Sequence, residues 1–172
     1  MNKKDLKTAL AFASTDRTRY TIHGVRVEPG RLIATDGHAA IIVHEASEWK
    51  PKSEGATIPR DDMKMLESRT LKGDVVVFAI GERTATAEIG GMPIETPIID
   101  GAFPEYDRVI PKPNPERSVR VGAKLLKRIC EAALETSDAR EVWIDLTFPE
   151  NEHCAIRFDG ERIEGAVMPQ RR

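Results

Sequence analysis

The sequence predicts an α+β fold built from three copies of one unit, which consists of a strand, a helix and three further strands. Apolar residues recur at helical spacing in three places, and each place is followed by three β-rich runs separated by short turn signals. The copies begin about 55 residues apart, and only the first copy has no clear leading strand. Because each copy has a single amphipathic helix, we expect antiparallel sheets with the helices on one face, and copies that pair to bury their cores.

The first copy begins with a helix over residues 3–14, which carries Leu6, Ala9, Leu10 and Ala13 on one side. Three β-rich runs follow it, and the turn signals Pro29-Gly30 and Asp36-Gly37 separate them, over residues 20–28, 31–35 and 38–45. Short turns between consecutive strands predict an antiparallel meander. A polar loop over residues 46–55 ends the copy.

The second copy has a short leading strand and then a helix that starts at Pro59. Proline followed by Asp61 and Asp62 is favourable chemistry for a helix N-terminus, because it fixes φ and places negative charge at the positive end of the helix dipole. The expected helix covers residues 59–69. The expected strands cover residues 56–59, 73–80, 83–89 and 92–99. The Gly81-Glu82 and Gly90-Gly91 pairs open no helix, so they predict turns and no phosphate-binding loop.

A connection over residues 101–116, with four prolines, leads to the third copy. The helix over 123–135 has an apolar face of Leu125, Leu126, Ile129, Ala132 and Ala133. We expect strands over residues 117–122, 141–148, 153–158 and 161–172, with turns at 149–152 and at Asp159-Gly160.

Composition indicates a soluble globular protein of one domain or one and a half. The 172 residues are 40% apolar and 31% charged, with a net charge of −2. No apolar run is long enough to cross a membrane, and the first residues contain no apolar signal region. Two cysteines, Cys130 and Cys154, fit a reducing compartment, so we expect a cytoplasmic protein with no membrane partner.

The pair Asp36 and His38 suggests a catalytic site, because the sequence has only four His. Two residues in one tight turn seldom converge on a substrate, and no nucleophile motif supports them. A hydrolase that uses Asp36 and His38 is therefore a low-ranked alternative to a polar turn. His44, His153 and Cys154 complete no zinc-ligand motif with His38, so we expect neither metal nor cofactor.

Basic residues accumulate on all three predicted helices. If the helices face the same way, they present a cationic surface to a phosphate backbone and bind it without reading its sequence. A solvated helix face is the alternative for each set taken alone. The residues are Lys3, Lys4 and Lys7, then Arg60, Lys64 and Arg69, and then Lys124, Lys127 and Arg128.

Three stretches together resemble the bacterial sliding clamp, the β subunit of DNA polymerase III. They are RLIATDGHAAIIV from residue 31, DGAFPEYDRVIPK from residue 100 and the C-terminal AVMPQRR. In that family a Thr-Asp-Gly-His turn lies in the middle domain, a Phe-Pro-Asp/Glu-Tyr stretch closes that domain, and a Val-Met-Pro-x-Arg tail ends the last domain. The resemblance implies a DNA-clamp fold and a non-catalytic processivity factor.

The resemblance also implies a shortened chain. Residues 1–112 match a complete clamp domain, 113–116 form a linker, and 117–172 match half of a domain with its tail. The family's ring contains twelve of the units, so four chains of three would supply them. A tetramer, a dimer and a monomer all remain open.

In the family, a groove between the middle and last domains binds short peptide motifs of polymerases and repair proteins. Ala39, Ala40 and Arg172 depart from the family's usual Arg, Leu and Leu, which affects the expected preference for partners. By position, the groove residues here are Thr35, Gly37, His38, Pro111, Val167, Met168, Pro169 and Arg171. The alternative is that these side chains only pack the sheet edges.

The family also contacts duplex DNA through a loop, to which Arg17, Arg19 and Tyr20 correspond by position. A loop that is only exposed to solvent is the alternative, because exposed basic residues are common. We therefore expect a clamp-like protein that tethers replication or repair proteins on duplex DNA. The alternative is a clamp-derived regulator that captures peptide motifs, or a full clamp, without encircling DNA.

Overall fold

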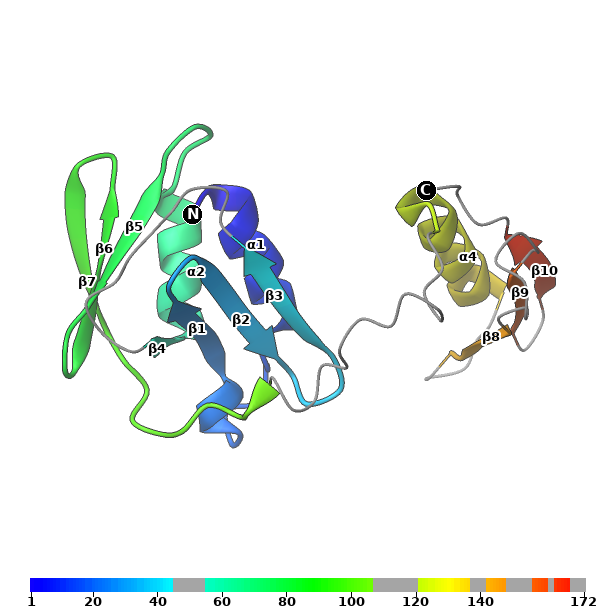
Figure 1. Ribbon diagram of the computed structural model, residues 1–172, viewed down its shortest axis with the longest axis horizontal. Coiled ribbons are helices and arrows are strands. Elements are labelled where there is room, and N and C mark those ends of the chain that lie inside the picture. Colours follow the sequence, from blue (N-terminus) through cyan, green and yellow to red (C-terminus); the bar gives the residue numbers. More distant parts are fainter. Residues whose placement is uncertain (45–54, 107–120, 137–141, 148–155, 161–162, 168–172) are drawn as a thin grey trace. The chain divides into compact units, whose positions relative to one another are not determined.

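The computed structural model describes residues 1–44, 55–106, 121–136, 142–147, 156–160 and 163–167 (Figure 1). Contacts divide the chain into two compact parts, Met1–Pro111 and Lys112–Arg172, which we call the N-terminal and C-terminal parts. The predicted linker 113–116 and the loop 46–54 lie outside the described residues. None of the helices in the described ranges has the length and apolar character needed to cross a membrane.

The first repeat consists of a helix, a single 3-10 turn and an antiparallel meander. Its elements are α1 (Lys3–Phe12), the 3-10 helix Tyr20–Ile22, β1 (Gly24–Glu28), β2 (Arg31–Thr35) and β3 (Ala40–His44). The Asn2 side chain accepts hydrogen bonds from the amides of Lys4 and Asp5, and the Asp5 carboxylate accepts one from the Asn2 amide. This capping box satisfies amides that a helix N-terminus leaves without partners.

The strand predicted over residues 20–28 is shorter in the structure. The amides of Ile22 and His23 bond back to the carbonyl of Arg19 at 3.0 Å, which curls residues 20–22 into the 3-10 helix. The His23 ring nitrogen Nδ1 lies 2.9 Å from the carbonyl oxygen of Ser14. Local hydrogen bonds therefore hold this segment, and only Gly24–Glu28 joins the sheet.

The second repeat has the element order that the sequence predicts. Its elements are β4 (Ala56–Pro59), α2 (Arg60–Arg69), β5 (Val76–Ile80), β6 (Thr84–Ile89) and β7 (Met92–Pro97). The sheets have the orders β3-β2-β1-β4 and β5-β6-β7, and all neighbouring strands are antiparallel. Although β4 leads into α2, it pairs with β1 of the first repeat.

One core is shared by both repeats of the N-terminal part. Leu6 of α1, Leu66 of α2, Leu32 of β2 and Val76 of β5 all belong to it and are at most 1% exposed. Burying such side chains contributes roughly 1.5–3 kcal/mol each relative to leaving them in water. Neither helix could bury its apolar face on its own sheet alone, so the two repeats stabilise each other.

The helices α1 and α2 lie side by side and antiparallel (Figure 1). At one end, Nη1 of Arg60, the first residue of α2, donates to the carbonyl oxygens of Leu10 and Ala13 at 2.6 Å each. At the other end, Lys3 Nζ lies 3.8 Å from a carboxylate oxygen of Glu67. Arg60 thus satisfies carbonyls that the C-terminus of α1 leaves open.

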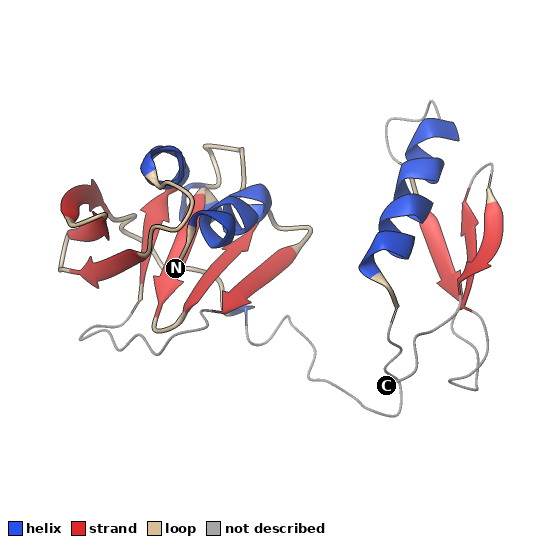
Figure 2. Cartoon of the chain, turned by 90° about the horizontal axis from the view of Figure 1, so that it is seen from above, coloured by secondary structure: helices blue, strands red, loops and turns tan. Residues whose placement is uncertain are grey.

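The third repeat places one helix against one face of a three-stranded sheet (Figure 2). Its described elements are α4 (Ala123–Thr136), β8 (Ile144–Thr147), β9 (Ile156–Gly160) and β10 (Glu164–Val167), with the antiparallel order β10-β9-β8. The predicted turn at Asp159-Gly160 is wrong, because these residues pair with Glu164 and Ile144 and extend β9. The predicted strand over 117–122, apart from its last two residues, and the turn at 149–152 lie outside the described residues.

Arg60→Ala is expected to lower the free energy of unfolding of the N-terminal part by about 1–3 kcal/mol, because two half-buried carbonyls of α1 lose a charged donor. Urea denaturation followed by circular dichroism measures the change. Arg69→Ala is the matched control, since Arg69 is exposed at the other end of α2. Equal midpoints for the two variants would contradict a capping role for Arg60.

Candidate functional site

The turn between β2 and β3 is held by its own side chains. The Thr35 hydroxyl donates to the carbonyl of Ala39 at 2.8 Å and accepts the amide of Gly37 at 3.1 Å. One carboxylate oxygen of Asp36 accepts the amides of His38 and Ala39, each at 2.8 Å. Gly37 has a φ of +93°, a conformation that glycine adopts without strain. The turn is therefore a preformed polar element at the end of the sheet.

Asp36 has a structural task in this turn. The hydrogen bonds from the amides of Ala39 and His38 lower the pKa of the Asp36 carboxyl below its ordinary value. A carboxylate with a lowered pKa is a weak base at neutral pH, and His38 projects from an exposed position beside it. This geometry gives no support to the hydrolase alternative. Within the described ranges, no three His, Cys, Asp or Glu side chains gather in a way that could hold a metal ion.

Arg19 reaches from the 3-10 segment onto the turn. Its Nη1 donates to the carbonyl oxygen of Asp36 at 3.2 Å. A Cβ built on Gly37 would lie 2.8 Å from that same Nη1 and 3.9 Å from Cδ1 of Ile22. A side chain at position 37 would therefore displace the guanidinium. Arg19, which corresponds by position to a DNA-contacting loop of the clamp family, thus contacts the predicted peptide-binding turn.

An apolar cluster lies on the face of the first sheet opposite the shared core. Ile22, Ile33, Phe103 and Tyr106 are at most 9% exposed, and half-buried Ile42 packs against them. Along β2, Ile33 points to this cluster, whereas its neighbours Leu32 and Ala34 point into the shared core. The Phe103 and Tyr106 rings meet edge to face with centroids 6.4 Å apart.

The first residues of the predicted connection 101–116 are therefore part of the packed structure. Phe103 and Tyr106 each present a large apolar surface, and burying it outweighs the cost of ordering the backbone on either side. Residues 107–116 lie outside the described residues. The sequence itself indicates this packing, because two aromatic residues in a segment rich in polar residues and proline are unusual for a loop exposed to water.

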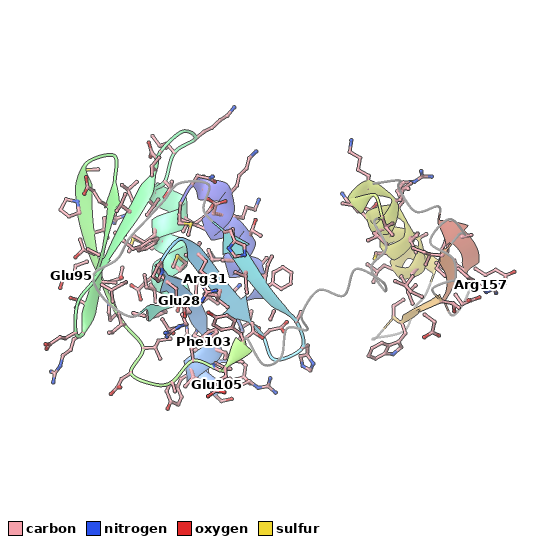
Figure 3. All side chains as sticks on the ribbon, in the orientation of Figure 1. Glu28, Arg31, Glu95, Phe103, Glu105 and Arg157 are labelled. Atoms are coloured by element: carbon pink, nitrogen blue, oxygen red, sulfur yellow. The ribbon has the colours of Figure 1, made fainter. Side chains whose placement is uncertain are left out.

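Glu28 anchors this segment to the sheet (Figure 3). The carboxylate is 8% exposed and accepts three hydrogen bonds: from Tyr106 Oη at 2.7 Å, from Arg31 Nε at 2.9 Å and from Arg26 Nε at 2.5 Å. The Arg31 guanidinium also lies 5.4 Å from the centre of the Tyr106 ring, within cation–π range. A cleft of about 550 Å³ borders these side chains together with Phe103.

Opposing effects act on the pKa of Glu28. Burial acts to raise the pKa of its carboxyl, but the hydrogen bonds and charges of Arg26, Tyr106 and Arg31 outweigh burial and lower that pKa below its ordinary value. The group is therefore ionised at neutral pH, and it holds the two arginines and the tyrosine together. Sequence reasoning missed this cluster, because Tyr106 follows Glu28 by 78 residues and no local pattern links them.

The predicted groove residues fall into two sets. Thr35 is half-buried, whereas Gly37 and His38 are exposed on the turn. Val167 ends β10 and pairs with Ile156. Pro111, Met168, Pro169 and Arg171 lie outside the described residues, as do His153 and Cys154.

The predicted DNA-binding residues differ in whether they form ion pairs or hydrogen bonds within the chain. Lys3 pairs with Glu67 at 3.8 Å, and Arg60 caps α1 and is only half exposed. The other described ion pairs of the set join Arg17 to Asp61 at 3.0 Å, Arg19 to Asp16 at 3.8 Å and Lys127 to Glu131 at 3.3 Å. Tyr20 is 58% exposed. The remaining cations are exposed and form no ion pair with a described residue: Lys4, Lys7, Lys64, Arg69, Lys124 and Arg128.

Comparison with known proteins finds bacterial sliding clamps. The chain is 29% identical over 151 residues to the beta sliding clamp of Salmonella typhimurium, which covers 84% of this chain and 40% of that protein. It is 35% identical over 121 residues to the beta sliding clamp of Caulobacter vibrioides, covering 63% of this chain and 32% of that protein. A scan against models of known protein families finds no match.

Solved structures share the fold. The crystal structure of DNA polymerase III subunit beta from Pseudomonas aeruginosa superposes with a TM-score of 0.74 at 18% identity, covering 99% of this chain and 50% of that one. The predicted clamp resemblance and the α+β clamp fold are therefore confirmed. The chain spans less than half the length of the curated relatives described above.

Glu28→Gln is expected to lower the free energy of unfolding at neutral pH by about 1.5–3 kcal/mol, because it removes a charged acceptor from three donors. The folded pKa of Glu28 lies below its ordinary value of 4.5, so the carboxylate stabilises the fold above that pH and loses this effect as pH falls through the folded value. The difference in the free energy of unfolding between wild type and Glu28→Gln should therefore become smaller below pH 4.5.

Urea denaturation at a series of pH values measures this gap. Glu88→Gln, at an exposed position on β6, is the control and should match wild type throughout. A gap for Glu28→Gln that stays constant from neutral to acidic pH would refute the role given to the charge.

Proposed function

We propose that this protein is a non-catalytic, clamp-like module that binds short peptide motifs of replication or repair proteins and holds them at duplex DNA. The observation that carries this proposal is the braced turn Thr35–Ala39, which stands over an apolar cluster that includes Phe103 and Tyr106. The resemblance to sliding clamps assigns the peptide groove to this turn and to the C-terminal tail.

The chemistry of the turn suits a peptide groove. The hydrogen bonds of the turn are formed without a ligand, so the turn is already ordered before a partner binds. Binding therefore costs less conformational entropy of the turn. We propose that Ile22 and Arg19 line the groove beside Thr35, Gly37 and His38. Pro111, Val167, Met168, Pro169 and Arg171 complete it in this proposal, with Met168 as an adaptable apolar surface. Such a site has a small apolar pocket and a polar rim.

DNA binding in this proposal is electrostatic and independent of sequence. Lys4 and Lys7 on α1 and Lys64 and Arg69 on α2 are exposed, and none forms an ion pair with a described residue. Because α1 and α2 lie side by side, these cations share one helical layer, where they can neutralise neighbouring phosphates. Arg60 is better explained by its capping of α1.

A regulator that captures peptides, or a full clamp, without encircling DNA is the second candidate. Its support is that three of the predicted DNA-binding cations, Arg17, Arg19 and Lys127, already form ion pairs with carboxylates of this chain. Retention on closed circular DNA with release after linearisation would support encirclement. Equal loss from circular and linear DNA would favour the regulator.

The double variant Met168→Ala, Pro169→Ala is expected to weaken binding of a labelled clamp-binding peptide at least about tenfold, which corresponds to 1.4 kcal/mol. Fluorescence anisotropy titration gives the dissociation constants. Met92→Ala, Pro93→Ala is the matched control, because it removes an exposed Met-Pro pair from β7. Unchanged affinity in the tail variant would remove the tail from the groove.

The double variant Lys4→Ala, Lys7→Ala is expected to reduce the slope of log K against log salt concentration for duplex DNA by about 2, close to one for each lost phosphate contact. Binding measured at several salt concentrations gives the slope. Lys72→Ala, Arg83→Ala removes two exposed cations outside the helices and should leave the slope unchanged. A slope insensitive to Lys4 and Lys7 would place DNA elsewhere.

A further inference from the structure

The third repeat has a helix that is only partly covered. In the N-terminal part, Leu6 of α1 and Leu66 of α2 are fully buried, because the two helices contact each other and both contact the first sheet. On α4, Leu125 and Leu126 are each 37% exposed and Leu134 is 63% exposed. The same kind of unit therefore leaves apolar surface open where the N-terminal part buries it against a second helix.

The exposed apolar side of α4 is symmetric along the helix. Leu126, Cys130 and Leu134 follow each other at i, i+4 and i+8, so they form one stripe. Cys130 is exposed and lies at the middle of the 14-residue helix. Antiparallel pairing of two such stripes about Cys130 would set Leu126 of each helix against Leu134 of the other.

The charges on α4 are divided between its two halves, basic at the N-terminal end and acidic at the C-terminal end. The N-terminal half carries Lys124, Lys127 and Arg128, and the C-terminal half carries Glu131 and Glu135. An antiparallel second copy would bring the basic half of one helix beside the acidic half of the other, and both contacts would be attractive. Parallel pairing would place like charges together.

The sheet of the third repeat also has open apolar surface. Trp143, which directly precedes β8, is 74% exposed, and Leu146 on β8 is 42% exposed. Among the described strands, β8 pairs only with β9, whereas β1 of the first repeat has β2 on one side and β4 of the other repeat on the second side. The third repeat thus offers both a helix face and a strand edge where the N-terminal part uses a second repeat.

We propose that the partner is a second copy of this chain, which docks α4 antiparallel on α4 about a two-fold axis near Cys130. Leu126 of each copy packs on Leu134 of the other, and Lys127 of each copy lies opposite Glu131 of the other. The antiparallel pair α1 and α2 shows that two repeats of this kind pack in this way. The interface contains no residue of the turn Thr35–Ala39, so dimerisation needs no bound peptide.

Charge reversal tests the interface without changing its apolar residues. The variant Lys124→Glu, Lys127→Glu, Arg128→Glu makes α4 acidic throughout, and the variant Glu131→Lys, Glu135→Lys makes it basic throughout. Light scattering should give wild type twice the 19.1 kDa mass of one chain and each variant the mass of one chain. An equimolar mixture of the two variants should regain the doubled mass, because their helices attract each other. A control with Lys72→Glu, Arg83→Glu should remain dimeric.

Two results would overturn the proposal: a monomeric wild type at all concentrations tested, or variants that stay dimeric on their own. If a variant fails to fold by circular dichroism, cross-linking of the otherwise unchanged chain decides. In a Cys154→Ser background, a short bis-maleimide should join Cys130 to Cys130 of the second copy, and Cys130→Ser should abolish the product. Absence of that product in a dimeric sample would refute the antiparallel geometry. All measurements exclude DNA and peptide, so failure of the proposed function leaves them interpretable.

Discussion

A helix laid on a three-stranded sheet has more apolar surface than that sheet can cover, and this constraint shapes the whole protein. In the N-terminal part the surplus of α1 is covered by α2 and by the second sheet, so Leu6, Met63 and Leu66 have no exposure to water. Arg60 and Lys3 then fix the direction of the two helices at their opposite ends. The repeat is thus a structural unit, but the pair of repeats is the folding unit.

The second organising interaction is ionic and lies on the other side of the first sheet. A nearly buried carboxylate is costly unless it is fully hydrogen-bonded, and Glu28 meets this condition with Arg26, Arg31 and Tyr106. Through Tyr106 the cluster holds the segment that follows β7 against β1. That segment supplies Phe103, which packs in one apolar cluster with Ile22 and Ile33. The charge of Glu28 thus stabilises the packing on this face of the first sheet.

Local patterns predicted the elements of the fold closely, because helical spacing and turn signals act over a few residues. The helix α2 begins within one residue of Pro59, and β2 has the predicted bounds. The predicted turn at Asp159-Gly160 was wrong because longer contacts decide there: both neighbouring strands hold these residues in β9. Local patterns also gave no prediction for the burial of Phe103 and Tyr106, whose partners lie far along the chain. For the site, the turn at Asp36-Gly37 could be predicted, but its bracing by Arg19 could not.

The pairing of β4 with β1 of the other repeat has a consequence for how this protein folds. This strand belongs to the second repeat, yet β1 flanks it on one side, and on the other side the amide of Ile99, beyond β7, bonds to the carbonyl of Thr57 at 2.8 Å. Both neighbours must be in place before β4 is fully paired, and they lie about thirty residues before it and forty after it. Neither repeat can thus reach its native state as an autonomous intermediate. Residues 1–106 should instead cross one barrier together, with loop closure as the main entropic cost.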